Sequence, residues 1–352
     1  MIRRLPWKPE WKSIRARTMV MLLCVNAVII LLLSLGAFRF YRQSFVDEIA
    51  SARSDVLRQI AERARQFKTN IYTLSNLYCN DNQFSEAVSE LTPATEGEFA
   101  LYMDQLTGQL QVSFHQVNLD FYVVYLSENG IGYCSVPTPE DYDYMNPKIK
   151  IWYRDLYQAG GAIVDVASYR DRALGINAYS AARTVRSSDG EIQGYLMINA
   201  DERQLYQMYA DVISAQSNIY VADSEGKIVS SNKDSIIGFS YFNMKNLDRL
   251  FGDKNHIITK ISGREALFTR YYDPESGFTV FEEIPLNVVL QPIERIRLVV
   301  LALALLALAG GTVMAWLFSR RIAAPLRKLC QDARQVEEGD LNQNTVFPRS
   351  TP

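Results

Sequence analysis

The strongest constraint on this chain comes from two long segments, residues 18–38 and 298–318, that contain no charged side chain. The hydrocarbon core of a bilayer is about 30 Å thick, and a helix of about 20 residues crosses it. Both segments reach that length. The sequence therefore predicts a membrane protein with two transmembrane helices, one near each end of the chain.

Basic residues flank the outer ends of the two apolar segments. Residues 1–17 contain several lysines and arginines against the single acid Glu10, and more basic residues follow the second segment at 320–328. Positively charged loops stay in the cytoplasm, so we expect a multi-pass protein of the plasma membrane with both termini cytoplasmic. Residues 39–297 then face outward, and the basic residues 1–17 contact membrane lipid.

A cleaved signal peptide is the alternative interpretation of the first segment. The apolar part of a signal peptide is about 7–15 residues long and ends at small residues. Residues 18–38 exceed that length and continue directly into a basic and aromatic stretch at 39–42. This favours an uncleaved anchor.

The charge balance and the cysteines limit the remaining possibilities. The net charge is -2, and a protein that binds nucleic acid needs a clustered excess of positive charge, so nucleic acid is not an expected partner. Of the four cysteines, Cys79 and Cys134 fall in the outward-facing region, which is oxidising. A disulfide between them and a pair of buried thiols both fit the sequence.

The outward-facing region predicts an α+β fold. Apolar residues recur at steps of three and four over residues 45–78, which predicts one long amphipathic helix leaving the membrane. From residue 119 the pattern changes to short β-rich segments separated by turn residues. We expect strands at 121–126, 131–134, 162–167, 175–184 and 192–199, a helix at 201–213, and further strands at 218–222, 227–230, near 257, 266–272 and 278–284. They form two small antiparallel-sheet units in series.

The sequence shows no enzyme site. His115 and His256 are isolated, and no group of Cys, His and Asp residues has the spacing of metal ligands. The Gly-x-Ser-x-Gly pattern of a nucleophile elbow is also absent from the sequence. We therefore expect no catalytic residue, no metal and no cofactor.

Two stretches of the outward-facing region resemble a known sensor family. Residues 146–157 read NPKIKIWYRDLY, and with 194–199, GYLMIN, they resemble the membrane-distal half of a bacterial double-Cache sensor. Residues 219–229, IYVADSEGKIV, resemble its membrane-proximal half. The resemblance implies two PAS-like antiparallel-sheet units, a distal one at about 80–213 and a proximal one at about 214–290, within a sensor domain at 39–297.

The same resemblance suggests where a ligand binds. In Cache sensors that bind amino acids, an Arg two positions before the Trp-Tyr pair holds the carboxylate, and an Asp on a later strand holds the ammonium. Here these positions are Lys150 and Asn199, which favours a neutral or mildly anionic small molecule. The expected ligand-binding residues are Lys150, Trp152, Tyr153, Tyr133, Tyr169 and Asn199. The alternative is that Trp152 and Tyr153 are core aromatics of the sheet.

The tail after the second apolar segment resembles a partial HAMP domain, residues 319–352. Residues 321–329 read RIAAPLRKL and resemble the first HAMP helix, and 338–341 read EGDL and resemble the connector. The residues expected to relay the signal are Pro325, Leu326, Gly339, Asp340 and Leu341. A juxtamembrane helix that simply ends at a glycine is the alternative.

This order of segments is similar to receptor histidine kinases of the YesM type and to chemoreceptors. The resemblance implies a homodimer that binds a small-molecule ligand outside the cell. Because no histidine lies in residues 319–352, we expect the sensory part of a two-component sensor histidine kinase that lacks its kinase domain, and no enzyme. A kinase module or response regulator is expected as a partner only in a full-length form. The alternatives are the input half of a methyl-accepting chemotaxis receptor and a kinase-less, membrane-anchored ligand-binding protein.

Overall fold

The computed structural model describes residues 14–137, 151–166, 168–171, 174–240, 243–261 and 263–318. The chain divides into two compact units. The terminal unit comprises Met1–Val46 and Leu290–Pro352, and the central unit comprises Asp47–Val289. Two helices, α1 (Ile14–Cys79) and α7 (Leu286–Phe318), contribute residues to both units.

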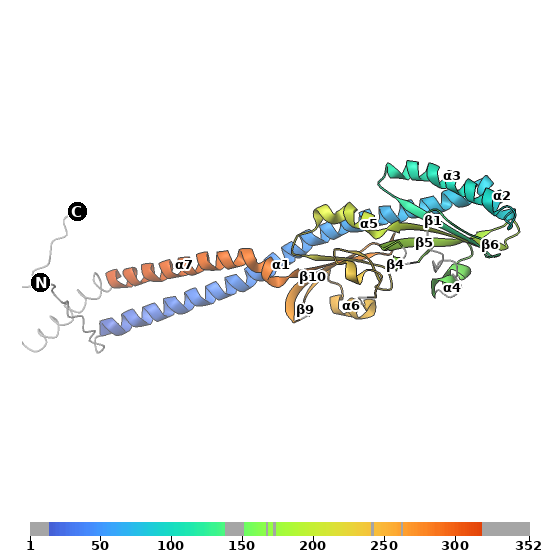
Figure 1. Cartoon of the computed structure of the whole chain (residues 1–352). Coiled ribbons are helices and arrows are strands. Elements are labelled where there is room, and N and C mark those ends of the chain that lie inside the picture. The colour runs from blue at the N-terminus through green and yellow to red at the C-terminus, as the bar shows by residue number, and fades with distance from the viewer. Residues whose placement is uncertain are drawn as a thin grey trace, which may run out of the picture. The chain divides into compact units, whose positions relative to one another are not determined.

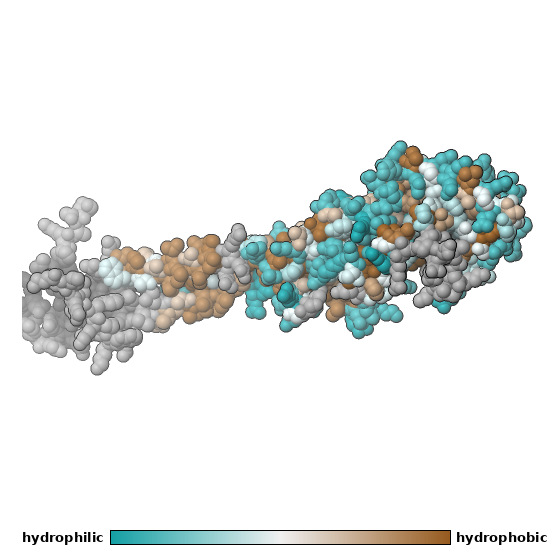
Figure 2. Space-filling view, viewed as in Figure 1, coloured by the Kyte–Doolittle hydropathy of each residue, from teal (hydrophilic) through white to brown (hydrophobic). Residues whose placement is uncertain are grey.

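The described part of the terminal unit consists of helical segments with apolar surfaces. The segments of α1 and α7 that belong to it contain the predicted spans 18–38 and 298–318. Both helices are long and apolar enough to cross a membrane, and Figure 2 shows hydrophobic residues covering their surface in this unit. Leu33 and Leu306 are each 68% exposed, which is costly in water and favourable in lipid.

The second half of α1 forms the helical backbone of the central unit. The predicted apolar stripe is buried from Ile60 onward, and this confirms the long amphipathic helix. Near its start the buried face differs from the predicted stripe, which passes through Ala52 and Val56: Ala52 is exposed, while Ala50 and Leu57 are buried. After α1 come α2 (Asn82–Ser89) and α3 (Glu96–His115), which the sequence did not predict.

The first sheet of the central unit has six antiparallel strands. Five of them follow the order β2-β1-β6-β5-β3, and β4 pairs with β5. The strands are β1 (Phe121–Ser127), β2 (Gly132–Cys134), β3 (Val164–Asp165), β4 (Tyr169–Asp171), β5 (Ile176–Arg186) and β6 (Ile192–Asp201). A short helix, α4 (Ile151–Gln158), precedes β3.

The second sheet follows the helix α5 (Glu202–Tyr209) and has the order β8-β7-β11-β10-β9. Its strands are β7 (Asn218–Ala222), β8 (Ile228–Ser231), β9 (His256–Ile261), β10 (Arg264–Tyr272) and β11 (Thr279–Pro285). The helix α6 (Met244–Phe251) precedes β9. Two antiparallel sheets and a long helix confirm the predicted α+β fold class.

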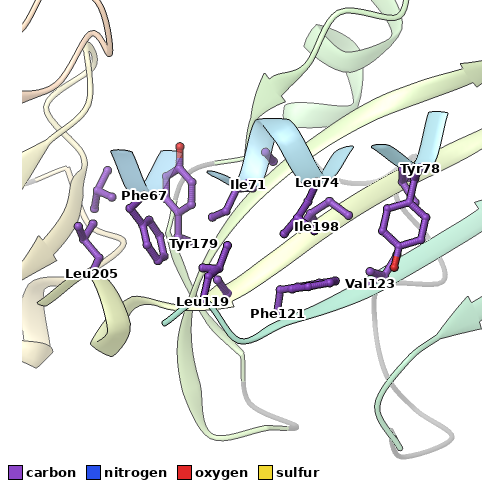
Figure 3. Packing of buried hydrophobic residues seen from close by; sticks show 14 of the residues in the cluster. Phe67, Ile71, Leu74, Tyr78, Leu119, Phe121, Val123, Tyr179, Ile198 and Leu205 are labelled. Atoms are coloured by element: carbon purple, nitrogen blue, oxygen red, sulfur yellow. The ribbon is translucent and has the colours of Figure 1, made fainter. Parts of the chain in front are cut away.

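Each sheet has an inner face toward α1 and an outer face away from it (Figure 1). One continuous core joins α1 to the inner faces of both sheets. Figure 3 shows Phe67, Ile71 and Leu74 of α1 directed at strand residues such as Val123 and Ile198. The outer face of the first sheet forms a separate cluster with α4, and that of the second sheet forms another with α6.

Candidate ligand-binding site

The outer face of the first sheet combines apolar and polar side chains beneath α4. Successive strand residues point to opposite faces, so Tyr122 of β1 and Asn199 of β6 lie on the outer face. The strand register pairs Asn199 with Tyr122 on one side and with Ser180 of β5 on the other. Asn199 therefore lies in the middle of the sheet, flanked by a residue of each neighbouring strand.

Asn199 is fully buried, with 0% of its side chain exposed. Its Oδ1 accepts hydrogen bonds from the Ser180 hydroxyl at 2.5 Å and the Tyr169 hydroxyl at 3.3 Å. Its Nδ2 donates to the Tyr122 carbonyl at 3.5 Å. A buried amide costs free energy unless it is hydrogen-bonded, and these partners offset that cost. Tyr169 and Asn199, both predicted from the sequence, are thus in direct contact.

A buried carboxylate accompanies the amide. Asp171 is 2% exposed, and its two oxygens accept from the Tyr122 hydroxyl and the Leu174 backbone N–H, each at 3.0 Å. The strand β4 aims Tyr169 and Asp171 at the same face because one residue separates them. The sequence analysis did not single out Asp171 or Tyr122. The sequence feature that could have indicated Asp171 is its spacing of two residues from Tyr169, which places both side chains on one face of a strand.

The helix α4 brings Tyr153 to the same face. The Tyr153 hydroxyl lies 2.5 Å from that of Tyr195 on β6, and their ring centroids are 5.2 Å apart. Leu156 of α4 is fully buried against the same cluster. The backbone of Trp152 belongs to α4, while its side chain and Lys150 lie outside the described residues.

Tyr133 lies on the opposite face of the sheet. It pairs with Tyr125 in the strand register, packs on Phe99 of α3 at 6.4 Å between ring centroids, and donates to Asp104 at 2.7 Å. The expectation that Tyr133 lines the same site as Tyr153 is therefore corrected, because the sheet separates the two side chains. Side chains alternate between the two faces of a sheet, so a shift of one residue in the pairing of β1 and β2 would move Tyr133 to the other face. The sequence alone did not give that pairing.

Cys79 and Cys134 are also separated by the first sheet. Cys79 packs against the core on the inner face, and Cys134 packs against the cluster on the outer face. This placement does not support a disulfide between them. Of the predicted relay residues, Pro325, Leu326, Gly339, Asp340 and Leu341 all lie outside the described residues.

The polar groups on the outer face are mainly hydrogen-bond acceptors and tyrosine hydroxyls. A carboxylate such as Asp171 only accepts, and an amide such as Asn199 both accepts and donates. Burial, together with hydrogen bonds to Glu128 and Tyr153, raises the pKa of the Tyr195 hydroxyl, which therefore stays protonated. The described residues contain no group of three or more potential metal ligands. The arrangement suits a small polar molecule that has at least one hydrogen-bond donor.

Comparisons with known proteins agree with this fold. No family model matches the chain. Over 211 residues, 58% of this chain, it is 20% identical to the methyl-accepting chemotaxis protein McpB of Bacillus subtilis (strain 168), and the matched region spans only 30% of that relative's length.

Similar solved structures are ligand-binding domains of chemoreceptors. That of Pseudomonas fluorescens CtaA in complex with L-isoleucine aligns with a TM-score of 0.50 and 11% identity, over 71% of this chain and 98% of that one. That of Campylobacter jejuni Tlp3 with L-norvaline aligns with a TM-score of 0.49 and 17% identity, over 70% and 94%. At these identities the likeness to CtaA is one of fold. The expected fold, a long helix with two antiparallel-sheet units, agrees with that of the CtaA ligand-binding domain, while the Cache sensor, kinase and HAMP assignments stay predictions.

Proposed function

We propose that this chain is the sensory part of a transmembrane receptor that binds a small molecule on the outer face of its first sheet. The observation that carries this proposal is the buried polar set on the outer face of the first sheet, centred on Asn199 and Asp171. An apolar core would pack there at lower cost, because each buried polar group must find a partner. A few polar groups set among apolar and aromatic side chains are typical of a ligand-binding site.

The ligand class follows from the groups available. We propose a neutral or mildly anionic small molecule whose hydrogen-bond donors face Asp171 and Asn199, with Lys150 as a point charge for any anionic group. The CtaA domain was solved with L-isoleucine, and the domain of Pseudomonas aeruginosa PctB with L-Arg. Their TM-scores against this chain are 0.50 and 0.48. Amino acids therefore belong among the compounds to be tried first.

The location and the assembly are part of the same proposal. Residues 18–38 and 298–318 cross the plasma membrane, both termini are cytoplasmic, and the central unit faces outward. The receptor works as a homodimer. Protease accessibility of the Lys227 turn in intact cells tests this arrangement, because cleavage only after the membrane is opened would place the central unit in the cytoplasm.

Residues 319–352 act as the first part of a HAMP relay toward an output module. In the first interpretation, the output module is that of a sensor histidine kinase. The similarity to the chemotaxis protein McpB favours a second one, in which this chain is the input half of a chemotaxis receptor. The cytoplasmic sequence that follows residue 352 in a longer form decides between them, since a chemoreceptor continues as a long coiled coil and a kinase as a phosphoacceptor and nucleotide-binding region.

Ligand binding is tested by thermal shift of the full chain in detergent, with a panel of L-amino acids, small carboxylates and small amides. A compound that stabilises the wild type should lose that effect in Trp152→Ala and lose much of it in Tyr169→Phe, which removes only the hydroxyl at Asn199. Tyr133→Phe is the matched control, because Tyr133 lies on the inner face. Equal stabilisation of all the variants would place the ligand elsewhere and overturn the assignment.

A further inference from the structure

The helix α4 is held on the first sheet partly by one polar chain of contacts. Tyr153 of α4, Tyr195 of β6 and Glu128 in the turn after β1 come from three separate segments. The Tyr153 and Tyr195 hydroxyls are 2.5 Å apart, and the Tyr195 hydroxyl also contacts a carboxylate oxygen of Glu128. Tyr195 itself is 5% exposed.

The direction of these hydrogen bonds follows from the number of protons. An ionised carboxylate can only accept, so Tyr195 donates its single hydroxyl proton to Glu128. The Tyr195 oxygen must then accept the proton of Tyr153. Each donation makes the next hydroxyl a better acceptor, and the charged end strengthens both bonds. The contacts form an ordered relay from Tyr153 through Tyr195 to Glu128.

Two of the three relay residues, Glu128 and Tyr195, belong to firmly held parts of the first sheet. The Glu128 backbone N–H donates to the Gln193 carbonyl at 3.0 Å, which fixes the turn to the start of β6. Tyr195 faces Leu126 in the register of β1 and β6. The relay therefore ties α4 to the central strands, the same strands that carry Asn199 and Tyr122.

We propose that Tyr195 and Glu128 are positioning residues of the ligand site: through the Tyr153 hydroxyl they hold α4 on the face of the sheet that carries Asn199. This inference rests on the proposed function, because positioning residues matter only if the outer face binds a ligand. A preorganised site binds more tightly, since its residues are already ordered before the ligand binds. Neither residue contacts the ligand in this proposal. They act through Tyr153.

Hydrogen exchange tests the relay without any ligand. In the full chain in detergent, the amides of residues 151–158 should exchange roughly tenfold faster in Tyr195→Phe, which keeps the ring and removes the hydroxyl. Glu128→Gln keeps an acceptor but removes the charge, so it should give a smaller acceleration. Tyr157→Phe is the matched control, because Tyr157 lies on the same helix and is 58% exposed. It should leave the exchange unchanged.

The outcomes separate this proposal from a general structural role. Faster exchange confined to 151–158, with β5 and β6 unchanged, supports the positioning role. Unchanged exchange of 151–158 in both relay variants overturns it, and so does equal acceleration of β5 and β6, which would mean that Tyr195 supports the whole sheet.

Fluorescence of Trp152 gives an independent readout of the same helix. It is measured in a background where the other tryptophans of the chain are replaced by phenylalanine. The emission of Trp152 and its quenching by acrylamide should change in Tyr195→Phe and stay at the wild-type level in Tyr157→Phe, and the absence of any change in Tyr195→Phe contradicts the proposal. Neither measurement uses a ligand. If α4 loosens as expected but no compound of the panel stabilises the wild type, the proposed function fails while the relay stands.

Discussion

Replacing Glu202 with glutamine should remove most of the pH dependence of the stability of the central unit between about pH 4.5 and 7. Glu202 begins α5 and is 1% exposed. Its Oε1 accepts from the Ser230 hydroxyl and from the Ser231 backbone N–H at 3.3 Å. The Ser230 hydroxyl in turn lies 2.5 Å from that of Tyr209. These contacts tie α5 to β8 of the second sheet.

Burial raises the pKa of the Glu202 carboxyl from 4.5 to about 7, and the nearby charges of Asp234 and Asp201 act in the same direction. The hydrogen bonds from Ser230 and Ser231 lower it, but by less than burial raises it. The native state therefore keeps a proton that the unfolded chain releases above pH 4.5.

The sign and size of the effect follow from this difference in proton binding. This contribution to stability is complete below the unfolded pKa and is lost as the pH rises through the folded pKa. One proton corresponds to a loss of about 1.4 kcal/mol per pH unit, so the free energy of unfolding should fall by about 3 kcal/mol over this window. For a domain of this size that corresponds to roughly 6–12 °C in Tm.

The assay is urea unfolding of the full chain in detergent from pH 4 to pH 8, followed by Trp152 fluorescence in the single-tryptophan background. Glu202→Gln keeps the shape and an acceptor for Ser230 and Ser231, so it should match the wild type near pH 4.5 and exceed its stability at pH 8 by about 3 kcal/mol. Glu86→Gln, at an exposed position of α2, is the control. If the wild type and Glu202→Gln follow parallel curves across this range, the argument from burial is refuted.

Two further substitutions test contacts of the central unit. Arg53→Met leaves the fully buried Glu282 carboxylate without its guanidinium partner and should lower the free energy of unfolding by about 3–5 kcal/mol, measured with urea. The double variant Arg53→Met/Glu282→Leu should recover most of this loss, because it removes the buried charge as well. A loss below about 1 kcal/mol in Arg53→Met would contradict this. Gly238→Ala places a Cβ 2.7 Å from the Ser168 carbonyl at a φ of +83°, so it should destabilise more than Gly263→Ala, where φ is +81° and no atom lies within 4 Å. Equal losses would show that the close contact has no effect.

Local patterns in the sequence were sufficient for much of the fold. The length of residues 18–38 and 298–318 alone predicts helices able to cross a bilayer, because the requirement is set by bilayer thickness. The stripe along α1 and most strands also followed from periodicity, and residues 218–222 coincide with β7. The helices α2, α3, α4 and α6 were not predicted. Three of them, α2, α4 and α6, have only 8 residues each, too few for a clear helical period, whereas α3 has 20 residues and was overlooked.

Contacts between distant parts of the chain determine which residues meet at the candidate site. The sequence pointed to Tyr153, Tyr169 and Asn199 as single residues, and the strand register is what brings Tyr169 to Asn199. The register also put Tyr133 on the inner face, against the expectation. Because side chains alternate between faces with a period of two, face and partner depend on how strands pair over long separations. Only the tertiary structure contains that pairing.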